Sequence, residues 1–146
     1  MKQYISIVAF IVFSQSIFAQ SEVFSTNKGA INGYDAVAYF IDSKAVEGKK
    51  ENSFVWKGET WHFTSTKNLD LFKSNPEKYA PQFGGFCAYG VADGHKAKTD
   101  PQSWTVVDGK LYLNYNKDVQ QLWKKDQKNF IIKANQNWVE VKKEKY

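Results

Sequence analysis

Residues 53–90 read SFVWKGETWHFTSTKNLDLFKSNPEKYAPQFGGFCAYG, and this stretch carries the signals that decide the fold. In residues 53–64, aromatic side chains alternate with other residues on both sides of Gly58-Glu59. This alternation predicts a β-hairpin with a two-residue turn. One face of the hairpin is then aromatic, with Trp56 opposite Trp61 and Phe54 opposite Phe63, and the other face holds Val55 and His62. The aromatic face predicts a hydrophobic core beside the hairpin.

Two short helices are expected after this hairpin. Ser65 or Thr66 is a suitable N-cap for a helix that turns Leu69 and Phe72 inward. Asn75-Pro76 then begins a second helix, with Asn75 as the cap and Pro76 at the first helical position, and this helix runs through Tyr79.

A second hairpin is predicted in residues 103–115, SWTVVDGKLYLNY. The dipeptide Asp108-Gly109 lies between two alternating strands, which is typical of a type I′ turn. This turn pairs Val106 with Leu111 and Trp104 with Leu113. It is the clearest local signal in the chain.

The flanking segments complete the expected fold. Asn116 is expected to cap a helix with Val119, Leu122 and Trp123 on one stripe, and AVAYFI, residues 36–41, is typical of a strand. A further helical stretch carries the apolar residues Phe130, Ile131, Ala134 and Trp138. We therefore expect an α+β fold, a compact single domain with two antiparallel β-hairpins and several short helices.

The first residues have the pattern of a secretory leader. Lys2 precedes an apolar run from Ile5 to Phe13, which is shorter than the roughly twenty residues that a membrane span needs. We expect cleavage after Ala19, which makes residues 1–19 a signal peptide; an uncleaved membrane anchor is the alternative. No cysteine follows the run, so lipid anchoring is excluded. Residues 20–32 are then an N-terminal loop segment, and the domain is exported to the periplasm or the outside of the cell.

Composition argues against a nucleic-acid partner. The chain of 146 residues has a formal net charge of +5, but its 20 basic residues are all lysine and are dispersed among acids. Arginine is the side chain that grips phosphates and bases in bidentate fashion. We expect a solvated basic surface, and we expect the lysine-rich tail of residues 142–146 to be frayed.

One further pattern carries a family resemblance. Phe72, Asn75, Pro76, Tyr79, Pro81, Gly84, Gly85, Cys87 and Ala88 fit the spacing F-x-x-NP-x-x-Y-x-P-x-x-GG-x-CA. The sequence is similar to the exported branch of the YHS domain family in this pattern and over residues 33–138. We therefore assign a YHS-like domain to residues 33–141.

The resemblance implies a metal-binding module, since relatives are appended to heavy-metal transport ATPases. Some exported relatives have selenocysteine at the position of Cys87, which implies a chemical role for that atom. The chain departs from the metal-site relatives because it has one cysteine where they often have two. A closed structural zinc site, with four ligands, is therefore not expected.

Cys87 is the only cysteine, so no internal disulfide can form. If a short helix begins near Phe86, Cys87 lies in its first turn, and the helix dipole lowers the thiol pKa. A thiolate is both a soft metal ligand and a nucleophile. The alternative is a buried, inert side chain, because Phe86, Ala88 and Tyr89 flank it and free cysteine is often buried.

The two histidines have weaker signals. His95 follows Gly94, a helix end, and either folds back as a second ligand beside Cys87 or stays a solvated loop residue. His62 is expected as an exposed or half-buried strand residue. Trp104 and Trp123 are expected in the core.

Three functions follow from these patterns. The first is handling of copper or another soft metal ion by Cys87 with help from His95. The second is thiol redox catalysis by Cys87, which reacts with a peroxide or a small thiol and cycles through sulfenic acid. The third is a non-catalytic domain that binds a small ligand or a protein through an aromatic groove.

Overall fold

The computed structural model describes residues 20–146, and the expected leader at residues 1–19 lies outside them. The described part has a mixed α+β fold with six α-helices and three two-stranded antiparallel sheets, as the hairpin and cap signals predict. The strands are β1 Ser25–Thr26, β2 Gly29–Ala30, β3 Lys49–Trp56, β4 Glu59–Phe63, β5 Trp104–Val107 and β6 Lys110–Leu113. The helices are α1 Ala38–Ile41, α2 Thr66–Ser74, α3 Pro76–Tyr79, α4 Ala88–Ala92, α5 Lys117–Lys125 and α6 Gln127–Val141, with 3₁₀ turns η1 Ile31–Gly33 and η2 Gln82–Gly85.

The β3–β4 hairpin forms with a different turn from the predicted one. Its turn residues are Lys57 and Gly58, whose φ angles are 50° and 76°, and strand pairing joins Trp56 to Glu59 and Phe54 to Trp61. A type I′ turn needs positive φ at both central residues, and glycine takes the second position at little cost. The predicted pairing of Trp56 with Trp61 is therefore wrong by two residues. A shift of two keeps each side chain on its predicted face, so the aromatic face is unchanged.

Residues 36–41 do not form the expected strand. Residues 38–41 are helix α1, because the Asp35 carboxylate caps the turn: its Oδ1 accepts hydrogen bonds from the backbone N–H groups of Val37 (2.8 Å) and Ala38 (3.1 Å). Its Oδ2 accepts bonds of 2.8 Å from the N–H and hydroxyl of Thr64 and from the side-chain amide of Asn68. Asp35 is fully buried and so ties α1 to β4 and α2.

The predicted helix caps are confirmed. Ser65, Asn75 and Asn116 each accept a hydrogen bond from the backbone N–H three residues ahead, at the starts of α2, α3 and α5. The β5–β6 hairpin has the predicted register. The predicted stripe on α5 is wrong at one position, because Leu122 is exposed while Trp123 is fully buried.

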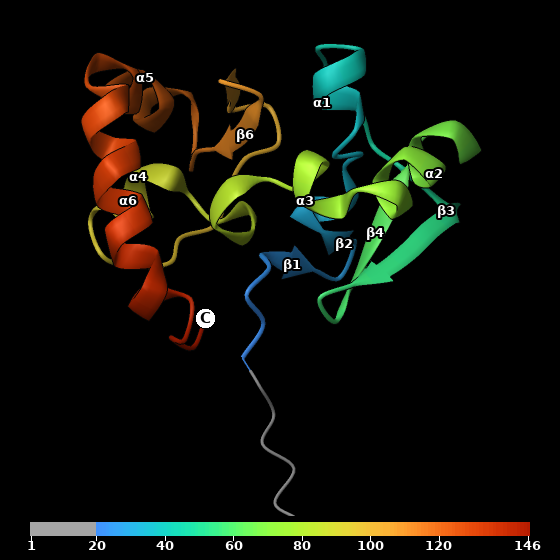
Figure 1. The fold of residues 1–146 in the computed structure, drawn as a ribbon, viewed down its shortest axis with the longest axis horizontal. Helices are drawn as coiled ribbons and strands as arrows, with labels where there is room; N and C mark the ends of the chain where they lie inside the picture. The colour runs from blue at the N-terminus through green and yellow to red at the C-terminus, as the bar shows by residue number, and fades with distance from the viewer. Residues whose placement is uncertain (1–19) are drawn as a thin grey trace, which may run out of the picture.

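Two hydrophobic clusters divide the fold into two halves (Figure 1). The Phe72 cluster lies among α1, α2 and the β3–β4 hairpin, where the Phe72 ring packs on Trp61 and Phe63 with centroid distances of 5.1 and 4.9 Å. The Trp123 cluster lies among α4, α5 and α6. Strand β6 serves both, because alternate side chains point to opposite faces of a strand. Its Leu111 and Leu113 join the Phe72 cluster, and its Tyr112 joins the Trp123 cluster.

The ends of the described chain are held together. Residues 20–32, expected as a loop, contain the short strands β1 and β2. The Lys96 ammonium donates hydrogen bonds to the carbonyl oxygens of Ser21, Lys142 and Glu144, at 3.3, 3.1 and 2.7 Å. The Tyr146 ring packs on Phe86 at 5.1 Å between centroids. The tail of residues 142–146, expected to be frayed, thus contacts the rest of the domain in this structure.

Within residues 20–146, none of the helices combines the length and the apolar character that a membrane crossing requires.

Candidate functional site

Cys87 lies between the η2 turn and helix α4, and its side chain is sealed in the protein. The residue is 1% exposed. Its Sγ donates to Oδ1 of Asn114 over 3.6 Å, and its backbone N–H donates to the Ala97 carbonyl at 3.0 Å. Helix α4 begins at Ala88, so Cys87 occupies the N-cap position rather than the first turn that the sequence suggested.

Burial raises the pKa of the Cys87 thiol above its usual value. The backbone N–H groups of Gly90, Tyr115 and Tyr89 act in the opposite direction, since they favour the thiolate, but they are outweighed. The expected lowering of the thiol pKa is therefore wrong. A short helix and three amides do not compensate for the loss of water around a sulfur charge.

The histidines do not complete a metal site around this thiol. The side chain of His95 is 54% exposed, and its Nδ1 lies 3.6 Å from the Asp93 carboxylate. His62 is half-buried on β4, as expected, with an Nδ1 that has no hydrogen-bond partner in the described chain. Across residues 20–146, no three His, Cys, Asp or Glu side chains gather in a group that could hold a metal ion. The described residues therefore offer no ready-made site of three or more such ligands.

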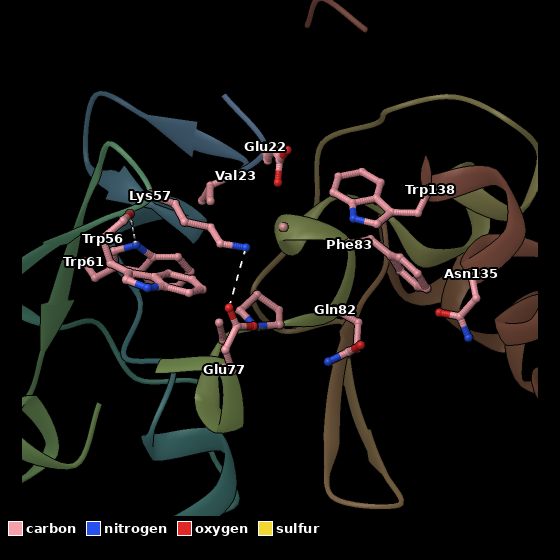
Figure 2. Close-up of a pocket in the computed structure, with 13 residues that line it drawn as sticks. Glu22, Val23, Trp56, Lys57, Trp61, Glu77, Gln82, Phe83, Asn135 and Trp138 are labelled. Carbon is pink, nitrogen blue, oxygen red and sulfur yellow. Dashed lines mark hydrogen bonds and ion pairs between the residues drawn. The ribbon is translucent and has the colours of Figure 1, made fainter. Parts of the chain in front are cut away.

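A cleft opens between the two halves of the fold (Figure 2). It has a volume of about 160 Å³. Its walls combine aromatic rings with charged and amide side chains. They are formed by Glu22, Val23, Trp56, Lys57, Trp61, Glu77, Ala80, Pro81, Gln82, Phe83, Gly84, Asn135 and Trp138.

Three tryptophans from two distant parts of the sequence form the aromatic walls. The Trp61 indole N–H donates to the Trp56 carbonyl at 3.1 Å, and the two rings lie 5.7 Å apart, which fixes both on the β3–β4 side. On the opposite side, Trp138 of α6 packs against Phe83 with centroids 6.0 Å apart. Figure 2 shows Trp138 extending from its helix toward Glu22 and Lys57. Because both walls are packed from behind, the cleft is held open by the cores of the two halves.

The floor of the cleft depends on the unusual backbone of η2. Phe83 and Gly84 have φ angles of 56° and 61°. A Cβ on Gly84 would lie 1.6 Å from the Glu22 carbonyl oxygen, and the Gly84 carbonyl accepts a 2.8 Å hydrogen bond from the Phe24 N–H. Only glycine permits this approach of two backbones. The first glycine of the diglycine therefore seats the segment around Glu22 against the cleft.

Charges of both signs line the cleft. The Lys57 ammonium lies 3.8 Å from the Glu77 carboxylate and 4.8 Å from the centroid of the Trp56 ring. Glu22 lies 3.5 Å from the Lys142 ammonium. Trp138, Gln82 and Asn135, whose indole N–H and side-chain amides can form hydrogen bonds, also line the cleft.

The sequence did not predict this cleft, because its walls come from four separated segments around Glu22, Trp56, Gln82 and Trp138. The one available signal was the abundance of tryptophan, which is five residues in the whole chain. Trp123 and Trp104 were correctly predicted to pack in the core. The remaining three line the cleft.

Comparison with protein families gives a match of the YHS domain to residues 37–83. The resemblance stated from the sequence motif is confirmed for this segment. The match ends before Gly84, Gly85 and Cys87, so it does not extend to the thiol. Comparisons with curated proteins and with solved structures give no significant match.

Proposed function

We propose that this chain is a non-catalytic binding domain that holds a small organic ligand in the cleft between its two halves. The observation that supports this proposal is the arrangement of Trp56 and Trp61 on one side of the cleft and Trp138 on the other, in a lining that also includes charged and amide side chains. Ligand sites in proteins are typically concave, with aromatic walls and a few polar groups that fix orientation.

The position of the YHS segment favours the same cleft. Eight of the 13 lining residues fall within residues 37–83: Trp56, Lys57, Trp61, Glu77, Ala80, Pro81, Gln82 and Phe83. The family-matched segment therefore supplies one wall and the floor, and α6 supplies the other wall.

The cleft accounts for function better than the thiol does. Metal transfer and redox catalysis both require an accessible and partly ionised sulfur. Cys87 is buried and its pKa is raised by that burial, whereas the charged groups of the cleft are exposed to solvent. The cleft is also small beside the roughly 300–1,000 Å³ of typical ligand pockets. A ligand of few atoms is therefore expected.

A titration of tryptophan fluorescence tests this proposal. The probes are indole, choline, glycine betaine and acetate, which cover aromatic, cationic, zwitterionic and anionic small molecules. At least one probe should change the emission in a saturable way and raise the melting temperature. Trp138→Leu should abolish the response, because it removes the ring on the α6 side of the cleft.

Val139→Ala is the matched control, since this neighbouring α6 residue is 57% exposed and does not line the cleft. It should bind like the unmodified protein. Absence of any saturable response to the four probes, or an equal response in Trp138→Leu, would contradict the proposal.

A further inference from the structure

The cleft offers separate positive and negative groups to a ligand. Lys57 extends from the β3–β4 turn, and Glu22 lies between the Lys57 ammonium and the Trp138 ring (Figure 2). The Lys57 stem is held by the Trp56 ring, with the ammonium 4.8 Å from the ring centroid, so its charge has a defined place. The cleft thus presents an ammonium group at Lys57, paired with Glu77, and a carboxylate at Glu22 toward the indole of Trp138.

We infer, resting on the proposed function, that the ligand of this cleft is a small zwitterion with one carboxylate and one ammonium group. Its carboxylate lies against Lys57, and its ammonium lies between the Glu22 carboxylate and the Trp138 ring. Each charge of the ligand then meets an opposite charge, and an indole face adds cation–π attraction.

A ligand with a single charge fits this arrangement less well. A simple anion meets Lys57 but also approaches the carboxylates of Glu22 and Glu77. A simple cation meets Glu22 and Trp138 but also approaches the Lys57 ammonium. Both lose part of their binding energy to like-charge repulsion, whereas a zwitterion meets Lys57 with its carboxylate and Glu22 with its ammonium.

The volume limits the length of the ligand. At about 160 Å³, the cleft holds a molecule of the size of a free amino acid or its N-methylated form. The amides of Gln82 and Asn135 and the indole N–H of Trp138 are the remaining polar groups that face such a molecule. They allow hydrogen bonds to the ligand carboxylate without a further charge.

Three probes of nearly equal shape test the contributions of the ligand's carboxylate and ammonium groups separately. Glycine betaine carries both charges, choline keeps the quaternary ammonium without the carboxylate, and 3,3-dimethylbutanoate keeps the carboxylate with a neutral tert-butyl group. Titration of tryptophan fluorescence should show that glycine betaine binds at least about tenfold more tightly than either analogue, since a well-placed charge contact contributes about this factor.

Two variants assign the charges to the walls. Lys57→Met should weaken glycine betaine and 3,3-dimethylbutanoate about tenfold and leave choline unchanged or slightly tighter. Glu22→Gln should weaken glycine betaine and choline and leave 3,3-dimethylbutanoate unchanged or tighter. Lys110→Met and Glu51→Gln, exposed positions that do not line the cleft, should bind all three probes like the unmodified protein.

The inference is overturned if choline or 3,3-dimethylbutanoate binds as tightly as glycine betaine, or if Lys57→Met weakens all three probes equally. Failure of glycine betaine with retained, Trp138-dependent binding of indole would overturn the zwitterion and leave the binding domain standing. Failure of every probe would overturn both.

Discussion

Asp35 and Cys87 occupy similar places in the two halves of the molecule, but they are bonded very differently. Each is buried to within 1% and lies just ahead of a short helix, α1 for Asp35 and α4 for Cys87. The Asp35 carboxylate accepts five hydrogen bonds of 2.8 to 3.1 Å. The Cys87 side chain makes one hydrogen bond, of 3.6 Å, to Asn114.

The difference in hydrogen bonding shows that Asp35 is important for the structure and that Cys87 is not placed for chemistry. A buried carboxylate with five donors organises its surroundings, since each donor loses its partner if the carboxylate is removed. A buried thiol with one weak bond behaves as a small apolar side chain. Neither group is open to a ligand. The groups that are open, on Lys57, Glu22 and Trp138, lie in the cleft between the halves.

The largest expected effect follows from Asp35→Ala. Removal of the carboxylate leaves the backbone N–H groups of Val37, Ala38 and Thr64 without partners in a buried site. We expect the free energy of unfolding to fall by about 3–5 kcal/mol, measured by urea denaturation. Asp42→Ala, at an exposed position after α1, should change it by less than about 0.5 kcal/mol. A loss below about 1 kcal/mol in Asp35→Ala would remove the contrast with Cys87.

Gly84→Ala should have the next largest effect. The new Cβ would lie 1.6 Å from the Glu22 carbonyl oxygen, at a φ of 61°. We expect a loss of about 2–4 kcal/mol in the free energy of unfolding. Gly109→Ala is the control, because its φ of 71° imposes similar backbone strain while no atom lies within 4 Å of the new Cβ.

The control should lose only about 1 kcal/mol, the cost of the left-handed backbone itself. Equal losses of unfolding free energy in Gly84→Ala and Gly109→Ala would show that the positive φ angle alone requires glycine at position 84. The close approach of the Glu22 carbonyl would then not matter.

Cys87→Ala should cost about 1–2 kcal/mol, since it removes one buried atom and one weak hydrogen bond. The stability contributed by the thiol should also depend on pH. Because burial raises the thiol pKa in the folded state, the unfolded chain loses this proton first. The contribution is present below the usual pKa of 9.0 and is lost as pH rises above it.

The difference in unfolding free energy between the unmodified protein and Cys87→Ala, measured from pH 7 upward, isolates this effect. In the folded protein, iodoacetamide should modify Cys87 far more slowly than in urea. A native alkylation rate close to the unfolded rate would show an accessible thiol and would restore the chemical hypotheses.

Sequence patterns predicted the local parts of this fold well. The caps at Ser65, Asn75 and Asn116 and the turn at Asp108-Gly109 depend on neighbouring residues alone, so they are legible in the sequence. The prediction failed for residues 36–41, where an apolar run indicated a strand. Their helix depends on Asp35, whose carboxylate also bonds to Thr64 and Asn68, and these distant partners cannot be identified from the local sequence.

The candidate site could not be predicted for the same reason. Cys87 drew attention by its chemistry, but its access to solvent depends on Asn114 and on the packing of the C-terminal half. The cleft joins Glu22 to Trp138 across almost the whole described chain. The spacing of residues along the sequence does not show which distant segments lie side by side in the fold.

The smallest expected change in unfolding free energy is that of Lys57→Met, which alters an exposed group of the cleft. Lys57 and Glu77 form an ion pair at 3.8 Å whose side chains are 43% and 77% exposed, so Lys57→Met should change the unfolding free energy by less than about 0.5 kcal/mol. Methionine keeps the stem against Trp56 and removes only the charge. A loss above about 1.5 kcal/mol would make Lys57 a structural residue like Asp35. A negligible loss would mean that the fold does not need this charge, as its proposed role in ligand binding requires.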